Sequence, residues 1–189
     1  MTRPRREPDV KAAEVAVADL LLALGYDLED ESLRDTPRRV AAAYEELLSP
    51  RTFDMTTFPN EEGYDELVVA REIPFSSLCE HHLLPFVGVA HVAYSPGQRI
   101  LGLSKLARVV EMFSRELQVQ ERMTMQIAHW LQECLEPRGV GVIVEAEHLC
   151  MSIRGVQKPG ATTVTTQFTG VFKDDPAEQV RFLTLVRGA

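Results

Sequence analysis

Two short clusters of cysteine and histidine carry the clearest chemistry in this sequence. The first contains Cys79 and His82, three positions apart, and the second contains His148 and Cys150. Thiolate and imidazole are ligands that zinc prefers, and one such pair is half of a zinc site. A cysteine in a strand is more often a small buried apolar residue. The combination of two pairs is what favours a metal centre built from distant segments.

Together the two clusters hold more donors than a catalytic zinc uses. A catalytic zinc takes three protein ligands and keeps one position open for water, whereas a structural zinc closes all four. The surplus histidines suit proton transfer, because imidazole titrates near neutrality. Zinc also lowers the pKa of a bound water to about 7, which makes a nucleophile. The residues therefore indicate metal-assisted hydrolysis and leave open which three ligate.

A strand predicted over 140–153 would position the second cluster. Side chains alternate along a strand, so His148 and Cys150 would share one face. The same face would carry Ser152 and Arg154 if the strand continues. A proton donor, a metal ligand and a cation suited to phosphate would then line one wall of a groove.

Lys105 and Arg108 open a predicted helix that begins near Ser104. Two cations are unfavourable at this end, because the helix dipole already makes the N-terminus positive. A bound anion would compensate for this charge, and helix N-termini bind phosphate. Taken alone, the pattern is better explained as a solvated helix face. Arg154, aligned with the metal ligands, shifts the interpretation towards an anionic ligand.

Gln120 and Glu121 begin the next predicted helix. A glutamate in a first helical turn is favoured by the dipole whatever its function. Its carboxylate could also accept paired hydrogen bonds from the N–H and NH₂ groups of a guanine-like edge, a pattern that adenine lacks. Both interpretations stay open at this point.

The elements that must position these residues follow from hydrophobic periodicity. Expected helices cover 10–24, 36–49, 104–117, 120–135 and 175–186, and expected strands cover 67–75, 86–94, 140–153 and 162–172. The order predicts an α+β fold, with a four-stranded antiparallel sheet, helices on one face and N-terminal helices before it. Segment 51–64 is expected to be a loop, segment 77–82 is too polar for a buried strand, and Cys134 is expected in the core. Open sheet edges predict closure by other subunits.

Composition narrows the class of partner. The 189 residues carry 20 Lys and Arg against 28 Asp and Glu, a formal net charge of −8. That balance argues against nucleic acid but allows a small anionic ligand, which needs few cations. No apolar run approaches the roughly 18 residues of a membrane span, and no signal peptide is visible, so we expect a cytoplasmic protein without membrane partners. Three cysteines are then more suited to ligation than to disulfides.

Several motifs together resemble those of the GTP cyclohydrolase I family. They are SLCEHHLLPF at 77–86, GLSK at 102–105, QVQER at 118–122 and HLC at 148–150. The resemblance spans about residues 20–172 in the right order and spacing. It implies the tunnelling fold, ββααββ with preceding helices, and a decamer of two pentamers with active sites between subunits. The chain would comprise a tail at 1–9, a helical region at 10–64 packed on the core, and a catalytic region at 65–189.

The resemblance also implies a role for each candidate residue. One Zn²⁺ per subunit would be held by Cys79, His82 and Cys150, while His81 and His148 would be unligated catalytic histidines. Glu121, with Gln120, would hold the guanine ring. The expected triphosphate contacts are Ser104, Lys105, Arg108, Arg154 and, from another subunit, Arg39.

The reaction implied by the resemblance converts GTP and water to 7,8-dihydroneopterin triphosphate and formate, the first committed step of pterin and folate-type biosynthesis. Zinc-activated water would attack purine C8, and the histidines would transfer protons. Three departures from the family pattern bear on phosphate affinity: Ala42 stands where a basic residue is common, Glu116 where a basic or neutral one is expected, and 167–169 is unusually bulky. None belongs to the metal or guanine set, so we expect an active enzyme.

Two other functions are compatible with these motifs. A nitrile reductase of the same fold acts on a deazaguanine with a cysteine nucleophile and a nicotinamide cofactor, and needs no zinc. A non-catalytic protein could use the Cys/His cluster only to stabilise its fold. Zinc binding separates the first from a cyclohydrolase, and turnover of GTP separates both.

Overall fold

A computed structural model describes residues 6–187, which fall into two compact units that divide between Ser49 and Pro50. Of the tail expected at 1–9, residues 1–5 lie outside the described residues, and residues 6–9 form no helix or strand. Asp9 ends this segment and caps the first helix, because its carboxylate accepts a hydrogen bond from the Ala12 N–H at 2.9 Å.

The N-terminal unit is a pair of helices, α1 (Val10–Ala23) and α2 (Thr36–Leu47), as predicted. Helix α2 carries Pro37 in its first turn, where a backbone N–H would have no acceptor within the helix, so the N–H that proline lacks is not missed. Arg39 is held within this unit, donating to the Ser32 carbonyl oxygen and to the Thr36 hydroxyl.

The second unit contains the sheet. Its strands are β1 (Thr57–Pro59), β2 (Val68–Cys79), β3 (Pro85–Ser95), β4 (Arg99–Leu101), β5 (Leu117–Gln118), β6 (Gly139–His148) and β7 (Thr162–Phe168). The main sheet has the order β5-β2-β3-β6-β7, and all of its neighbours are antiparallel except the short β5, which runs parallel to β2. The predicted α+β class and the four-stranded antiparallel core are confirmed.

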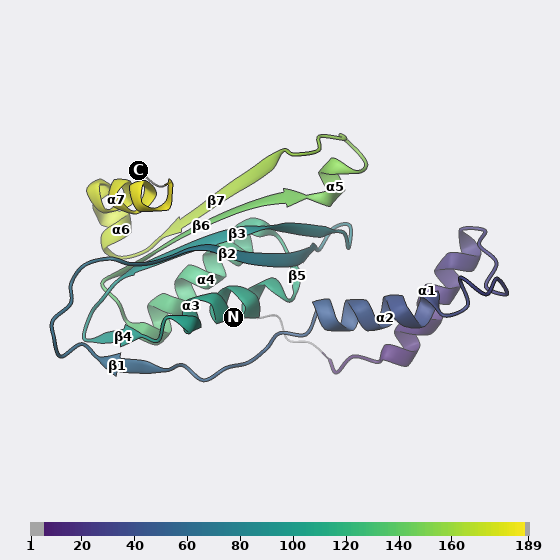
Figure 1. The fold of residues 1–189 in the computed structure, drawn as a ribbon, viewed down its shortest axis with the longest axis horizontal. Coiled ribbons are helices and arrows are strands. Elements are labelled where there is room, and N and C mark those ends of the chain that lie inside the picture. The colour runs from purple at the N-terminus through teal and green to yellow at the C-terminus, as the bar shows by residue number, and fades with distance from the viewer. Residues whose placement is uncertain (1–5, 188–189) are drawn as a thin grey trace. The chain divides into compact units, whose positions relative to one another are not determined.

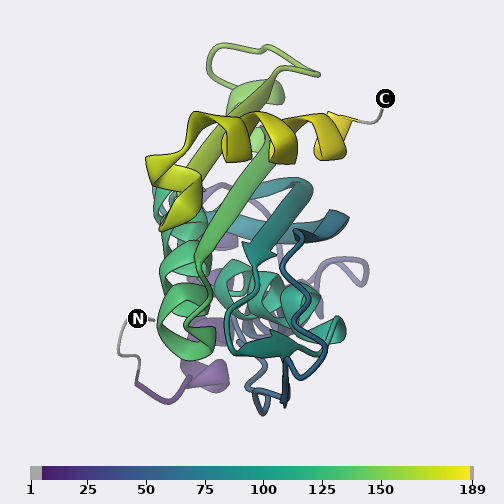
Figure 2. The same ribbon diagram turned by 90° about the vertical axis from the view of Figure 1, so that its left-hand side faces the viewer.

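Helices pack on both faces of the sheet (Figures 1 and 2). On one face, α3 (Ser104–Ser114) and α4 (Gln120–Leu135) cover alternate strand residues such as Val92 and Val142. On the other, α6 (Val171–Asp174) and α7 (Pro176–Arg187) cover Ala93 and Ile143 through Phe172 and Phe182. Because side chains alternate along each strand, the buried apolar residues form two separate cores, one on each face of the sheet. The layer of α3 and α4 is the predicted one, and the C-terminal helices add a smaller second layer.

The expected strand over 140–153 is too long. Strand β6 ends at His148 and is followed by the short helix α5 (Leu149–Ser152), so Cys150, Ser152 and Arg154 do not alternate along a strand. The ladder stops here because β3 begins at Pro85, which offers no N–H for a further bond. The Ser152 hydroxyl then bonds the His148 carbonyl oxygen at 3.2 Å.

Other expectations are also corrected. The polar segment 77–82 contributes to a strand after all, since β2 continues to Cys79 and the buried Ser77 hydroxyl donates to the Glu116 carbonyl oxygen. Cys134 is exposed on α4 rather than in the core, and Leu135 is buried instead. The loop at 51–64 contains β1, which pairs with β4, and Phe172 belongs to α6 and not to a strand.

Gly88 in β3 allows β6 to approach closely, and its replacement tests the sheet. A Cβ atom at this position would overlap the Glu145 carbonyl oxygen and the Ala146 Cα atom. Gly88→Ala is expected to lower the free energy of unfolding by about 2 kcal/mol or more, because backbone atoms must move. Thermal unfolding of Gly102→Ala is the control, since the nearest atom there, the Thr56 carbonyl oxygen, is 3.5 Å away. An equal midpoint for both variants would contradict this register.

Candidate active site

The topology of the sheet brings the two sequence clusters together. Strands β2 and β6 run in the same direction on either side of β3, so their C-terminal ends lie at the same end of the sheet (Figure 1). Ser77 pairs with Phe86, and Phe86 pairs in turn with His148. Cys79 lies two residues beyond Ser77, and Cys150 lies two residues beyond His148. Two segments that are distant in sequence therefore place the Cys79 and Cys150 sulfur atoms at the same end of the sheet.

A tight turn places His82 against Cys79. The Cys79 N–H donates to the Leu84 carbonyl oxygen at 2.9 Å, and the Cys79 carbonyl oxygen accepts from the Leu83 N–H at 2.9 Å. Leu83 takes the left-handed conformation, with φ of 55°, that reverses the chain. The His82 Nδ1 atom consequently lies 3.6 Å from the Cys79 sulfur. The predicted three-residue spacing does bring the two donors to one side.

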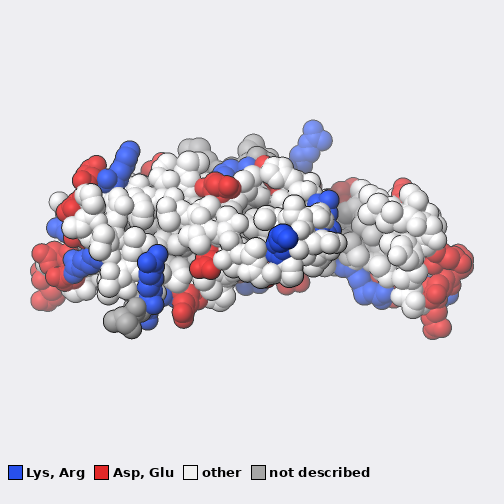
Figure 3. All heavy atoms as spheres, turned by 90° about the horizontal axis from the view of Figure 1, so that it is seen from above, with Lys and Arg blue, Asp and Glu red and all other residues white. Residues whose placement is uncertain are grey.

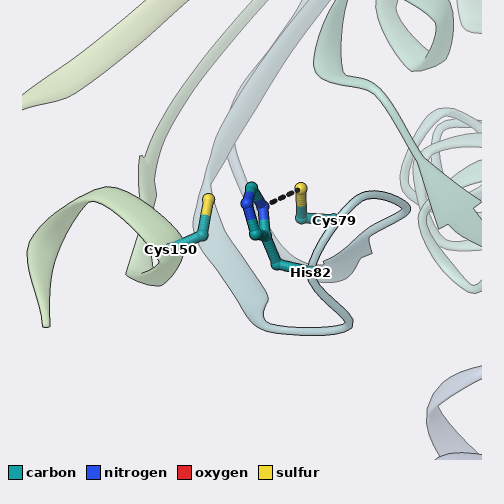
Figure 4. Close-up of side chains that lie close together, drawn as sticks. All are labelled: Cys79, His82 and Cys150. Carbon is teal, nitrogen blue, oxygen red and sulfur yellow. Dashed lines mark hydrogen bonds between the residues drawn. The ribbon is translucent and has the colours of Figure 1, made fainter. Parts of the chain in front are cut away.

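The resulting cluster of Cys79, His82 and Cys150 fits a zinc ion. Their ligand atoms all lie within 4.8 Å of one another (Figure 4). Tetrahedral zinc with bonds of 2.0–2.3 Å sets its ligand atoms about 3.5 Å apart, so a small side-chain rotation completes the triangle. Two thiolates and an imidazole form a zinc-type donor set, and three ligands leave the fourth position open.

Both cysteines of this cluster are buried. Burial raises the pKa of the Cys150 thiol, the nearby Cys79 raises it further, and the Arg154 guanidinium opposes the rise. A raised thiol pKa disfavours the thiolate unless a cation is bound. Because metal ligation requires the thiolate, an ion at this position relieves the repulsion between the two sulfur atoms.

His148 lies beside the cluster and not within it. Its ring stacks on the Phe86 ring, with centroids 4.5 Å apart and planes inclined by 4°. Its Nε2 atom lies 2.7 Å from the Gln120 Oε1 atom. Burial lowers the pKa of His148, and the Glu121 carboxylate partly offsets this effect. A rigidly held histidine with a lowered pKa is suited to accepting a proton during a reaction.

His81 occupies the outer side of the same turn. Its side chain is 64% exposed, and its Nε2 atom lies 3.8 Å from a Glu80 carboxylate oxygen. Glu80 is itself fixed by Arg122, whose Nη2 atom lies 2.7 Å from the second carboxylate oxygen. Sequence reasoning assigned no role to Glu80 or Arg122, and their only signal was their place within the motifs.

Comparison with known proteins places these features in a family. The family model described as GTP cyclohydrolase I matches residues 13–187. The chain belongs to the GTP cyclohydrolase I family. Two bacterial relatives named GTP cyclohydrolase 1 support this assignment. The protein from Allorhizobium ampelinum is 54% identical over 98% of this chain and 93% of its own length, and the protein from Sinorhizobium fredii is 52% identical over 96% and 91%.

Among solved structures, an apo archaeosine synthase QueF-Like is similar to part of the fold. It aligns with a TM-score of 0.40 and 12% identity, over 64% of this chain and 97% of its own. The assignment to the GTP cyclohydrolase I family rests on the sequence matches, which extend over nearly the whole chain.

The two residues that the family resemblance assigned to guanine lie in different surroundings. Glu121 is exposed in the first turn of α4, where its charge acts on His148. Gln120 is only 1% exposed and bonds β6 and β7. Glu121 is therefore open to a ligand at the site, whereas Gln120 lies beneath it.

The cations expected to bind triphosphate are divided in the structure. Arg154 follows α5, and its charge acts on Cys150. Ser104 and Lys105 begin α3, whose other end leads to β5 beside Cys79, so about 15 Å of helix separates them from the metal cluster. Arg108 lines a separate cavity of about 480 Å³ between α3 and β2. Arg39 belongs to the N-terminal unit.

The departures from the family pattern are outside the set of Cys79, His82 and Cys150. Ala42 is exposed on α2, and Glu116 is buried beside β5. Phe168 packs on Phe172 and Phe182, while the Thr169 hydroxyl donates to Gln132 of α4. The bulk of 167–169 thus supports the C-terminal helices.

The distribution of surface charge is relevant to nucleic-acid partners, and the length and polarity of the helices are relevant to membranes. On the face shown in Figure 3, the Lys and Arg side chains of the described residues stand apart from one another and form no continuous basic stripe. Within residues 6–187, every helix is too short or too polar to cross a lipid bilayer.

Proposed function

We propose that this chain is a zinc-dependent GTP cyclohydrolase I that converts GTP and water to 7,8-dihydroneopterin triphosphate and formate, the first committed step of pterin and folate-type biosynthesis. The observation that carries the proposal is the convergence of Cys79, His82 and Cys150 beside His148. The chain that carries these residues belongs to the GTP cyclohydrolase I family, and it is 52% and 54% identical to two proteins named GTP cyclohydrolase 1.

In this proposal the cysteines and His82 would hold one zinc ion per subunit. A bound zinc ion supplies a nucleophilic water at neutral pH and polarises the group that it attacks. His148, fixed on Phe86, is placed to move a proton: its Nδ1 atom would take up the proton that the attacking water releases and deliver it to a ring nitrogen of the purine. His81, on the exposed side of the turn, is placed for later proton transfers.

Substrate binding would use the carboxylate of Glu121 for the guanine edge and Arg154 for phosphate. Ser104 and Lys105 lie at the far end of α3 from the cluster of their own chain, and Arg108 lines the separate cavity between α3 and β2. We propose that these residues, with Arg39, serve the site of a neighbouring subunit in a decamer of two pentamers. A native mass of ten subunits would support this assignment, and a monomeric mass with full activity would overturn it.

The deciding experiment mixes zinc-replete protein with GTP and measures formate together with pterin fluorescence after oxidation. A cyclohydrolase releases both in equal amounts. A nitrile reductase consumes a nicotinamide cofactor and releases no formate, and a zinc-stabilised binding protein gives neither product. Absence of both products at full zinc occupancy would overturn the proposed function.

Glu121→Ala tests the guanine-binding role. The substitution removes the only proposed acceptor for the guanine edge, so kcat/KM for GTP is expected to fall about 10²-fold or more. Zinc content should be unchanged, since Glu121 is outside the ligand set. Glu133→Ala, which removes another exposed glutamate from α4, is the matched control and should retain full activity. Unchanged kinetics for Glu121→Ala would remove this residue from base recognition.

A further inference from the structure

Both ends of the Gln120 side-chain amide have hydrogen-bond partners within the fold. It is 1% exposed at the first residue of α4. Its Nε2 atom lies 3.1 Å from the Val144 carbonyl oxygen, 2.9 Å from the Thr163 carbonyl oxygen and 3.2 Å from the Thr165 hydroxyl. Because carbonyl oxygens only accept hydrogen bonds, this end of the amide must be the NH₂ group. The other end is therefore the amide oxygen.

The orientation of this amide determines the protonation pattern of His148. The Gln120 Oε1 atom, which can only accept, lies 2.7 Å from His148 Nε2. His148 Nε2 must then carry the proton, and its Nδ1 atom is left as the nitrogen that accepts or delivers one. The Phe86 ring, stacked at 4.5 Å, fixes the plane in which Nδ1 points.

We propose that Gln120 is a positioning residue that sets the tautomer and ring orientation of His148, and that its side chain does not contact the guanine. The role of His148 in proton transfer rests on the proposed function. The tautomer and orientation of its ring follow from the hydrogen bonds of Gln120 alone. Both N–H groups of the Gln120 amide are already used within the fold, so a contact with guanine would break buried bonds.

The support for Gln120 extends to the edge of the sheet. The Thr165 hydroxyl of β7 bonds both Gln120 Nε2 and the Thr124 hydroxyl, the latter at 2.7 Å. The Thr124 hydroxyl also lies 2.8 Å from the Gln120 carbonyl oxygen, one turn back on α4. Strand β7, which touches none of the metal ligands in the described hydrogen bonds, thereby holds the proton-transfer histidine in place.

A double-mutant cycle tests the role of Gln120 in turnover. Gln120→Met keeps the length of the side chain and removes the acceptor, and is expected to lower kcat about 10²-fold while KM for GTP stays within about threefold. In a His148→Ala background, adding Gln120→Met should change kcat less than twofold, because Gln120 acts through His148. Equal losses in both backgrounds, or a rise in KM with kcat retained, would overturn the inference.

Matched variants separate positioning from folding. Gln132→Met removes another glutamine of α4 that bonds a backbone carbonyl, that of Pro137 at 3.0 Å, and should keep kcat. Gln120→Glu is the conservative variant for both backgrounds. Its protonated carboxyl can donate to Val144 and still accept from His148, so it should restore more kcat than Gln120→Met. A Gln120→Glu enzyme no faster than Gln120→Met, at equal zinc content, would contradict the proposed role.

A measurement without turnover keeps this inference distinct from the proposed function. Nitrogen-15 spectra of histidine-labelled, zinc-loaded protein should show His148 protonated at Nε2 and bare at Nδ1, with the signal assigned by its loss in His148→Ala. Gln120→Met should give a mixture of both tautomers. Protonation of His148 at Nδ1 in the unmodified protein would overturn the inference even if the protein turns over GTP.

Discussion

Cys150→Ser is expected to lose zinc and activity together. A serine hydroxyl is a much poorer zinc ligand than a thiolate, and only two donors of the cluster would remain. Zinc measured per subunit should fall from one to near zero at micromolar free zinc, and formate release should fall at least about 10³-fold, because metal and nucleophile are lost at once. Elemental analysis of the dialysed protein and the GTP assay measure the two quantities.

The control for this prediction is Cys134→Ser. Cys134 is exposed on α4 and lies outside the metal cluster, so both zinc content and turnover should be unchanged. If Cys150→Ser kept one zinc per subunit and its activity, Cys150 would not be a ligand. The cluster would then have to be completed by another donor.

His148→Ala is expected to separate metal binding from catalysis. His148 lies beside the cluster and bonds Gln120, so its loss should leave zinc at one per subunit. Turnover should fall about 10³-fold, within the range typical of a lost general acid or base. A His148→Ala protein without zinc would show that the assignment of ligands is wrong.

His129→Ala provides the comparison for His148→Ala. His129 is an exposed histidine on α4, and its removal should affect neither zinc nor kcat. Both variants remove one imidazole from the chain. A difference in turnover between them therefore reports on position rather than on histidine content.

Much of the site was predictable because its donors are marked by residue type and spacing. Any tight turn at this spacing brings Cys79 and His82 to one side of the chain. Strands β2 and β6 both run antiparallel to β3, so they point in the same direction and end close together. The helices were predictable for a similar reason, since their apolar residues recur with the helical period.

The remaining features depend on tertiary neighbours that a sequence pattern does not report. The end of β6 depends on Pro85 in the adjacent strand, and it places Cys150 on a helical turn. A glutamine at the start of a helix could face a ligand or the interior, and only the carbonyl groups of Val144 and Thr163 decide that Gln120 faces inward. Cys134 matches the apolar stripe of α4, yet the stripe moves to Leu135 in the last turn.

The position of the Cys79 and Cys150 sulfur atoms has a consequence for the stability of the sheet. Strands β2 and β6 share no hydrogen bonds, since β3 lies between them. A metal ion held by both cysteines is thus a removable crosslink across three strands, and it closes a long stretch of chain that the unfolded protein leaves open. Its contribution to folding grows with the logarithm of the free metal concentration. In the proposed function, the ion that serves the reaction would therefore also stabilise the fold at this end of the sheet.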